Sequence, residues 1–198
     1  MQNHHGKLSS GPTGRVVSSL AVAMIRDRRG LSGIEFALVL PIIVVLFAGT
    51  IDLGQGLMVS RKIDQVASVV SDIVARKSSW TAAQLDSLLA GSANIVEPFS
   101  SDSLKVQIAV IDINGSGKDS VNWSHGYGMT AVAAGQKSPI TIPAKIAESG
   151  VQMIVSQVTY SMETPFTSLL SSFTGVSRYT FDRHSFARPR VKDTVTKN

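Results

Sequence analysis

The sequence predicts an α+β protein, in which one long N-terminal transmembrane helix continues into a small antiparallel-sheet domain. Three observations lead to this fold class. Residues 36–51 contain no charged side chain, residues 63–74 carry apolar side chains at helical spacing, and residues 104–110 alternate between apolar and other side chains with the period of a strand. A membrane span, a helical continuation and a sheet are therefore expected in this order.

The composition agrees with one modest domain and an appended apolar segment. The chain has 198 residues, of which 43% are hydrophobic and 17% are charged, whereas a soluble domain carries about 25% charged residues. It has no cysteine, which excludes a disulfide framework, thiolate zinc sites and cysteine nucleophiles.

The net charge of +5 comes mainly from the N-terminus. Residues 1–30 hold five basic residues and one acidic residue, while the rest of the chain holds 14 basic and 13 acidic residues. A nucleic-acid binder needs a basic patch on a folded face, so no nucleic-acid partner is expected. We interpret residues 1–30 as a basic cytoplasmic leader.

The predicted transmembrane helix covers residues 31–51, about 31 Å at 1.5 Å per residue, against a hydrocarbon core of about 30 Å. Glu35 lies near one end of this window. A buried core helix of a soluble protein is an alternative, but no comparable apolar elements remain to surround it. A cleaved secretory signal is another alternative. The apolar region of such a signal is only about 7–15 residues long, which is shorter than the predicted span.

The charges at the two ends of the span predict its orientation. Arg26, Arg28 and Arg29 precede it, whereas Asp52 follows it. By the positive-inside rule, the N-terminus is cytoplasmic and the C-terminus periplasmic. A single-pass protein of the inner (cytoplasmic) membrane is expected.

The helix is expected to continue outward over residues 52–77. Its apolar stripe comprises Ile63, Val66, Ala67, Val70, Ile73 and Val74. A second, short helix should follow, because Thr81 and Gln84 have capping-box spacing and Gly91 is a natural stop.

The remaining pattern predicts a small α+β periplasmic or extracellular domain over residues 78–187. A turn cluster at residues 114–117 should join two strands as a hairpin. The expected extended segments are residues 104–110, 120–125, 140–142, 151–162 and 177–186, with a brief helix or loop at 166–173. The polar residues 188–198 are expected to be a flexible tail.

The sequence contains no strong catalytic or metal motif. Asp112 opens a segment that resembles a calcium loop, but the twelfth position is Trp123 where a bidentate glutamate is needed, so a hairpin turn is favoured. The four histidines lack metal-ligand spacing, and no nucleophile motif is present. We therefore expect no enzyme, metal, cofactor or small-molecule substrate.

Glu35 is the most informative residue. A charged side chain at the centre of a membrane helix costs about 2.5–3.5 kcal/mol on insertion scales and less near an end, and it is by default a functional hypothesis. The alternative is that Glu35 lies at the interface and is simply hydrated.

The segment Arg28-Arg29-Gly30-Leu31-Ser-Gly-Ile-Glu35-Phe36 resembles the prepilin-peptidase site of the TadE/TadG-like minor pseudopilins of tight-adherence (Flp) type IV pilus systems. Four other segments are also similar to this family: Ala37–Pro41, Asp52-Leu53-Gly54, Val158–Pro165 and Arg188-Pro189-Arg190.

This resemblance implies a pilin-like fold and a role in pilus assembly, adhesion or secretion. It places cleavage between Gly30 and Leu31, by a prepilin peptidase, and makes Glu35, next to Phe36, the residue that pairs with the new amine of a neighbouring subunit. Other pilins or pilus assembly proteins are the implied partners, and the protein can form part of a surface pilus. The alternative is an unprocessed membrane-anchored scaffold that is not incorporated into the fibre.

Overall fold

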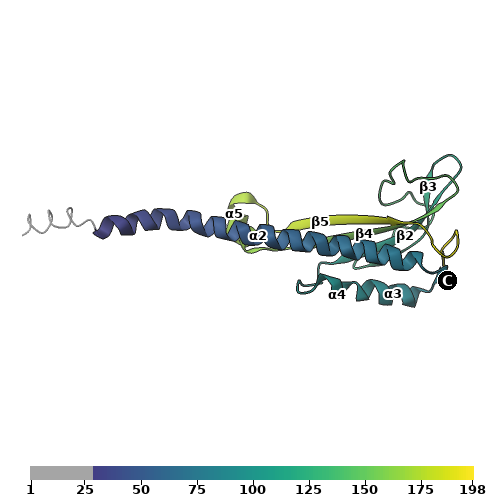
Figure 1. Cartoon of the computed structure of the whole chain (residues 1–198), viewed down its shortest axis with the longest axis horizontal. Helices are drawn as coiled ribbons and strands as arrows, with labels where there is room; N and C mark the ends of the chain where they lie inside the picture. The colour runs from purple at the N-terminus through teal and green to yellow at the C-terminus, as the bar shows by residue number, and fades with distance from the viewer. Residues whose placement is uncertain (1–28) are drawn as a thin grey trace, which may run out of the picture. The chain divides into compact units, whose positions relative to one another are not determined.

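The structure, a computed structural model, describes residues 29–198 (Figure 1). Contacts divide the chain after Phe47, and residues 48–198 form one compact unit. The helices are α2 (Arg29–Ala75), α3 (Ala82–Gly91), α4 (Ala93–Val96) and α5 (Pro165–Thr174), and the strands are β1 (Ser79–Trp80), β2 (Lys105–Ile113), β3 (Asp119–Tyr127), β4 (Gln152–Met162), β5 (Tyr179–Ala187) and β6 (Thr196–Lys197).

The main sheet has four antiparallel strands in the order β3-β2-β4-β5. Strands β2 and β3 form the predicted hairpin, with Val106 opposite Tyr127 and Ile113 opposite Asp119. The register shifts between Val110 and Ile111, which is the irregularity of a β-bulge. The predicted antiparallel sheet is confirmed.

One face of the sheet packs against the C-terminal part of α2, which lies along it in Figure 1. The predicted stripe supplies this contact, because Ile63, Val66 and Val70 are fully buried. They meet Val106 and Ile108 of β2 in the same core. Burying an aliphatic side chain of this size contributes about 1.5–3 kcal/mol, so the stripe is the main attachment of α2 to the sheet. The predicted α+β arrangement is confirmed.

Helix α3 completes this core from beside α2. Leu85 and Leu89 are fully buried in it. The helix begins as the sequence predicts, because the Thr81 hydroxyl accepts a hydrogen bond from the Gln84 N–H and the Gln84 side chain accepts one from the Thr81 N–H.

The opposite face of the sheet is covered by the long connection between β3 and β4. A second apolar cluster contains Ala109, Ile111, Ile113, Val121, Met153 and Val155. Ile140 and Ile142 pack against it from the connection. The segment 140–142, expected to be extended, forms no strand. Pro139 and Pro143 lack the N–H that a sheet ladder needs. The two isoleucines instead pack over the second apolar cluster.

Residues 188–198 differ from the expected flexible tail. Val195 is 1% exposed, and its carbonyl accepts a hydrogen bond of 2.8 Å from the Trp123 indole N–H. The next two residues, in β6, pair in parallel with β1. The correction has a physical reason: a buried apolar side chain, satisfied backbone hydrogen bonds and strand pairing hold a segment whose other residues are mostly polar.

Candidate functional site

The motif that the sequence predicts as a cleavage site lies at the start of α2, which begins at Arg29. Gly30 and Leu31 are in its first turn, and Leu31 and Glu35 are separated by four residues, about one helical turn. A free amine at Leu31 and the Glu35 carboxylate would therefore lie near the same face of the helix. Arg26 and Arg28 of the predicted topology signal lie outside the described residues.

The apolar segment of α2 is exposed. Its most apolar window has a mean hydropathy of 2.5 and is 6% buried. Phe36 is 62% exposed, and the other large apolar side chains from 34 to 47 are also exposed. A core helix of a soluble protein would bury most of these side chains. The helix is thus long and apolar enough to span a membrane.

Glu35 is also exposed. Within residues 29–198, its carboxylate makes no hydrogen bond or ion pair with another side chain. The structure therefore places Glu35 on the apolar helix without an internal partner from this part of the chain.

Asp52 stood out in the sequence as the charge after the span and as the start of a family-like segment, but neither observation predicts its contacts. It is 5% exposed. Its carboxylate accepts hydrogen bonds from the Thr164 hydroxyl and, at 3.3 Å, from the Phe166 N–H. Thr164 is the N-cap of α5 and Pro165 its first residue, so Asp52 also faces the positive end of a helix dipole. We call this arrangement the Asp52 latch.

We expect Asp52→Ala to weaken the attachment of α5. The change leaves the Phe166 N–H and the Thr164 hydroxyl without this acceptor, and an unsatisfied buried donor costs about 1–3 kcal/mol. Thermal unfolding of the detergent-solubilised full chain measures the loss. Asp193→Ala, the same change at an exposed position, is the control and should stay within about 0.5 kcal/mol. Equal stability of both variants would contradict the latch.

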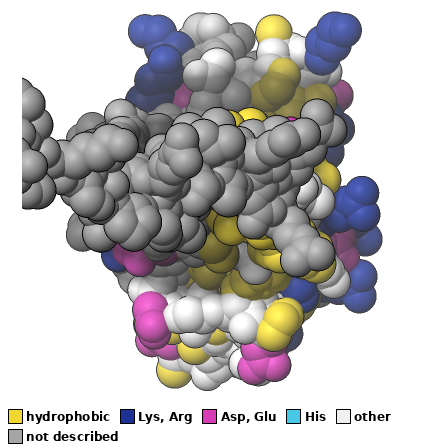
Figure 2. Space-filling model, turned by 90° about the vertical axis from the view of Figure 1, so that its left-hand side faces the viewer, with side chains coloured by type: hydrophobic (Ala, Val, Ile, Leu, Met, Phe, Trp, Pro, Cys, Tyr) yellow, Lys and Arg dark blue, Asp and Glu magenta, His cyan; other side chains and the backbone are white. Residues whose placement is uncertain are grey.

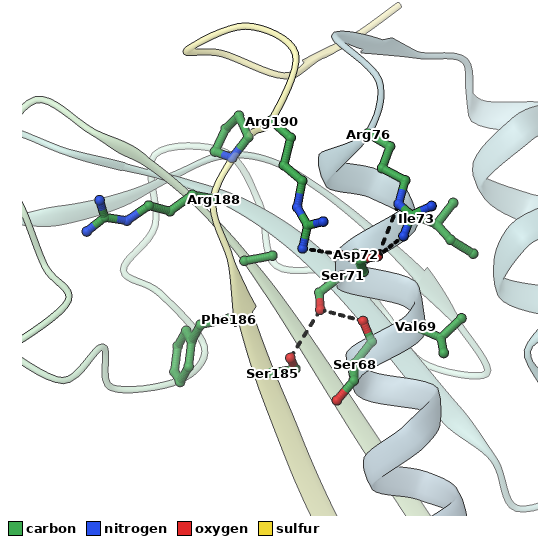
Figure 3. Close-up of a pocket in the computed structure, with 12 residues that line it drawn as sticks. Ser68, Val69, Ser71, Asp72, Ile73, Arg76, Ser185, Phe186, Arg188 and Arg190 are labelled. Carbon is green, nitrogen blue, oxygen red and sulfur yellow. Dashed lines mark hydrogen bonds and ion pairs between the residues drawn. The ribbon is translucent and has the colours of Figure 1, made fainter.

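Figure 3 shows an arginine-lined cleft of about 770 Å³ between the outer end of α2 and the end of β5. Arg76 and Arg190 both donate to the Asp72 carboxylate, Arg76 at 2.6 Å. The Arg190 N–H also donates to the Ala75 carbonyl, at 2.9 Å. Ser71 bonds Ser185 across the cleft, at 3.1 Å. These contacts tie residues 185–190 to the end of α2.

Arg188, on the same segment, pairs with Glu148 of the long connection at 2.6 Å. Hydrogen bonding and the charge of Arg188 lower the pKa of Glu148, and the reverse effects raise the pKa of Arg188. Because both side chains lie at the surface, 47% and 59% exposed, solvent screens the pair and it adds little to stability.

Tyr160 is the other described group with a shifted pKa. Burial raises the pKa of its phenol, the nearby Asp102 charge raises it further, and a hydrogen bond with Ser103 acts in the opposite direction. The phenol donates to the Ser100 carbonyl at 2.7 Å. A high pKa keeps this donor protonated, which suits a structural contact.

The turn after Asp112 is a hairpin connection. The Asn114 side-chain oxygen accepts from the N–H groups of Ser116 and Lys118, at 3.1 and 2.9 Å. The Asp112 carboxylate accepts from two side-chain amides, Asn122 at 2.6 Å and Gln152 at 2.8 Å. These oxygens are thus engaged within the protein. Among residues 29–198, no three His, Cys, Asp or Glu side chains gather as metal ligands.

The polar features thus fall into two groups. One is the N-terminal motif on an exposed apolar helix, and the other is the set of contacts that hold residues 48–198, here called the outer unit, together. The sequence indicated Gly30, Leu31, Glu35 and Phe36 but missed the Asp52 latch. The available signal was an acidic residue directly after the span and a Thr-Pro pair typical of a helix start.

Comparison with known proteins bears on the same part of the chain. Residues 30–71 match the sequence model of a family described as TadE-like protein. Neither the curated proteins nor the solved structures give a match.

Proposed function

Because residues 30–71 carry the TadE-like family pattern, we propose that this protein is a minor pseudopilin or pilus assembly component of a tight-adherence (Flp) type IV pilus or secretion system. It is anchored in the inner membrane by α2, with its N-terminus in the cytoplasm and its outer unit in the periplasm. A prepilin peptidase cleaves it between Gly30 and Leu31.

The observation that carries this proposal is the position of the motif. The Gly30-to-Glu35 spacing lies at the start of a helix whose apolar side chains are exposed from 34 to 47. The span has one acidic residue, Glu35, near its proposed inner end, and this residue has no partner among residues 29–198. This favours pairing between subunits, because a lone charge in lipid is costly.

The outer unit favours protein partners over nucleic acid. Basic and acidic side chains both lie around the edge of the face drawn in Figure 2. Mixed charges of this kind are typical of protein surfaces, whereas phosphate binding needs clustered Lys and Arg. The proposed partners are the peptidase, other pilins and pilus assembly proteins, and no small-molecule substrate is part of the proposal.

We predict processing at the Gly30–Leu31 bond. The peptidase should remove residues 1–30 and leave Leu31 as the new N-terminus, one helical turn from Glu35. Mass spectrometry of the N-terminal peptide, from protein extracted out of its native membrane, measures this. Gly30→Leu, which adds a bulky side chain at the bond, should leave the leader attached.

The alternative function is an unprocessed scaffold that helps to build the pilus without entering it. It keeps the same anchor and outer unit. A wild-type protein that still carries residues 1–30, in cells with an active peptidase, would favour this scaffold and contradict processing.

We also predict an N-in, C-out orientation. The arginines before the span should stay in the cytoplasm, where the positive-inside rule places them. A periplasm-active reporter fused after Asn198 should be active, and the same reporter fused at residue 20 should be silent. The reverse pattern would overturn the periplasmic location of the outer unit.

A further inference from the structure

We propose that the end of the outer unit next to the span is seated in the outer leaflet of the membrane, and that phospholipid acyl chains fill an apolar groove there. This inference rests on the proposed function, because it requires α2 to be a membrane anchor. It extends the lipid-contacting part of the protein beyond Ile51.

The groove lies between α2 and β5, within residues 48–198, and has a volume of about 550 Å³. Its α2 wall is formed by Gly49, Asp52, Leu53, Gly56, Leu57 and Ser60. Its other wall contains the rings of Phe166, Tyr179 and Phe181. The absence of a side chain at Gly56 keeps the groove deep at this point, where a Cβ would already lie 3.7 Å from the Phe181 ring.

The groove is bordered by unpartnered apolar side chains. Leu53 is 73% exposed, Leu57 is 63% exposed and Met58 is 53% exposed. In water, an exposed apolar patch of this kind marks a binding surface. Along α2, these three are the next exposed large apolar side chains after Phe47. The lipid that surrounds the proposed span can therefore cover them as well, and no further partner is needed.

The length of the span also supports a location of the groove in the outer leaflet. A hydrocarbon core of about 30 Å corresponds to about 20 residues of helix. Counted from a Glu35 at the inner interface, this core ends near residue 55. Asp52 and Leu53 then lie inside the outer leaflet, and Leu57 and Met58 lie at its boundary.

The outer end of the groove has the residues of a membrane interface. Arg183 lines it there, and Arg61 follows Ser60 on α2. Basic side chains are favoured at this level because their charged ends reach the headgroups while their apolar stems stay in the acyl region. The Arg183 side chain is held in place by Ser60, at 2.7 Å, and by Asp64, at 3.2 Å.

The Asp52 latch fits this location. A carboxylate at this depth would be costly if it faced lipid alone. Although it lines the groove, it is only 5% exposed, and its carboxylate is satisfied by hydrogen bonds from Thr164 and Phe166. The latch therefore gives a physical reason why an acidic residue is tolerated within the apolar end of the outer unit.

Spin labels can test the occupant, because the chain has no cysteine of its own. Leu57→Cys and the control Gln65→Cys, an exposed position about two turns further along α2, are labelled in the full chain. The protein is reconstituted in phosphatidylethanolamine–phosphatidylglycerol vesicles. Collision of the label with oxygen, which concentrates in lipid, is compared with collision with a water-soluble nickel chelate.

We expect the oxygen-to-nickel ratio to be several-fold higher at Leu57 than at Gln65. Equal ratios would place the groove in water and overturn the inference. A Leu57 label that is shielded from both reagents, together with disulfide-linked dimers of Leu57→Cys, would overturn it by identifying a second copy of the chain as the occupant. Carbonate extraction distinguishes failure of the proposed function from failure of this inference. Protein released by carbonate would contradict the membrane anchor. Protein that stays in the membrane but has a nickel-accessible label at Leu57 would contradict only the lipid occupancy of the groove.

Discussion

Glu35→Gln should abolish most pilus assembly while leaving membrane insertion and protein level normal. The change removes a charge but keeps the shape of the side chain and part of its hydrogen bonding. Insertion should not suffer, because the span becomes less polar. Losing one partner of a buried charge pair typically costs about 3–5 kcal/mol, and each 1.4 kcal/mol is about a tenfold change in affinity. Docking between subunits should therefore weaken more than a hundredfold.

The measurement is pilus yield beside the membrane level of the variant. Glu97→Gln, the same chemical change at an exposed residue of the outer unit, is the matched control and should assemble normally. Glu35→Asp keeps the charge on a shorter side chain and should retain part of the yield. Normal piliation in Glu35→Gln would end the pairing hypothesis and leave Glu35 as a hydrated interfacial residue.

The second large effect is expected from the C-terminal segment. Val195→Asp should lower the free energy of unfolding of the outer unit by several kcal/mol, because it puts an unpaired charge at a position that is 1% exposed. It should also weaken the contacts that depend on Val195, namely the hydrogen bonds of its backbone with Trp123 and Gln152.

Val191→Asp is the control, since Val191 is in the same segment but 60% exposed. Thermal unfolding of the detergent-solubilised full chain should show a change within about 0.5 kcal/mol for this variant. If both variants unfold like the wild type, residues 188–198 behave as the flexible tail that their polarity suggests.

Local patterns were sufficient for the main elements. The stripe from Ile63 to Val74 predicted the face of α2 that meets the sheet, because one helical period places these side chains on one side. The pair Thr81 and Gln84 predicted the start of α3, since a cap depends only on residues three apart. For the same reason, the turn cluster after Asp112 predicted the β2–β3 hairpin.

Contacts between distant residues were beyond such patterns. The Asp52 latch joins residues 112 positions apart, and the Trp123 bond to the Val195 carbonyl joins residues 72 positions apart. Neither partner carries a local signal that names the other. The role of Ile140 and Ile142 could not be predicted from local pattern either. A short apolar segment between prolines is compatible with a strand and also with a loop that packs over a sheet.

The sequence alone determined the exposed apolar helix, its continuation as an amphipathic helix, the antiparallel strands and the Gly30-to-Glu35 spacing. These properties depend on composition and on periods of two or 3.6 residues, which operate over a few neighbours along the chain. Only the tertiary structure decided where Asp52 finds its hydrogen bonds, how Val195 holds residues 188–198, and that α2 and β5 leave an apolar groove at Gly56. Each of these depends on which side chains from remote segments meet, and their meeting is set by the packing of the whole unit.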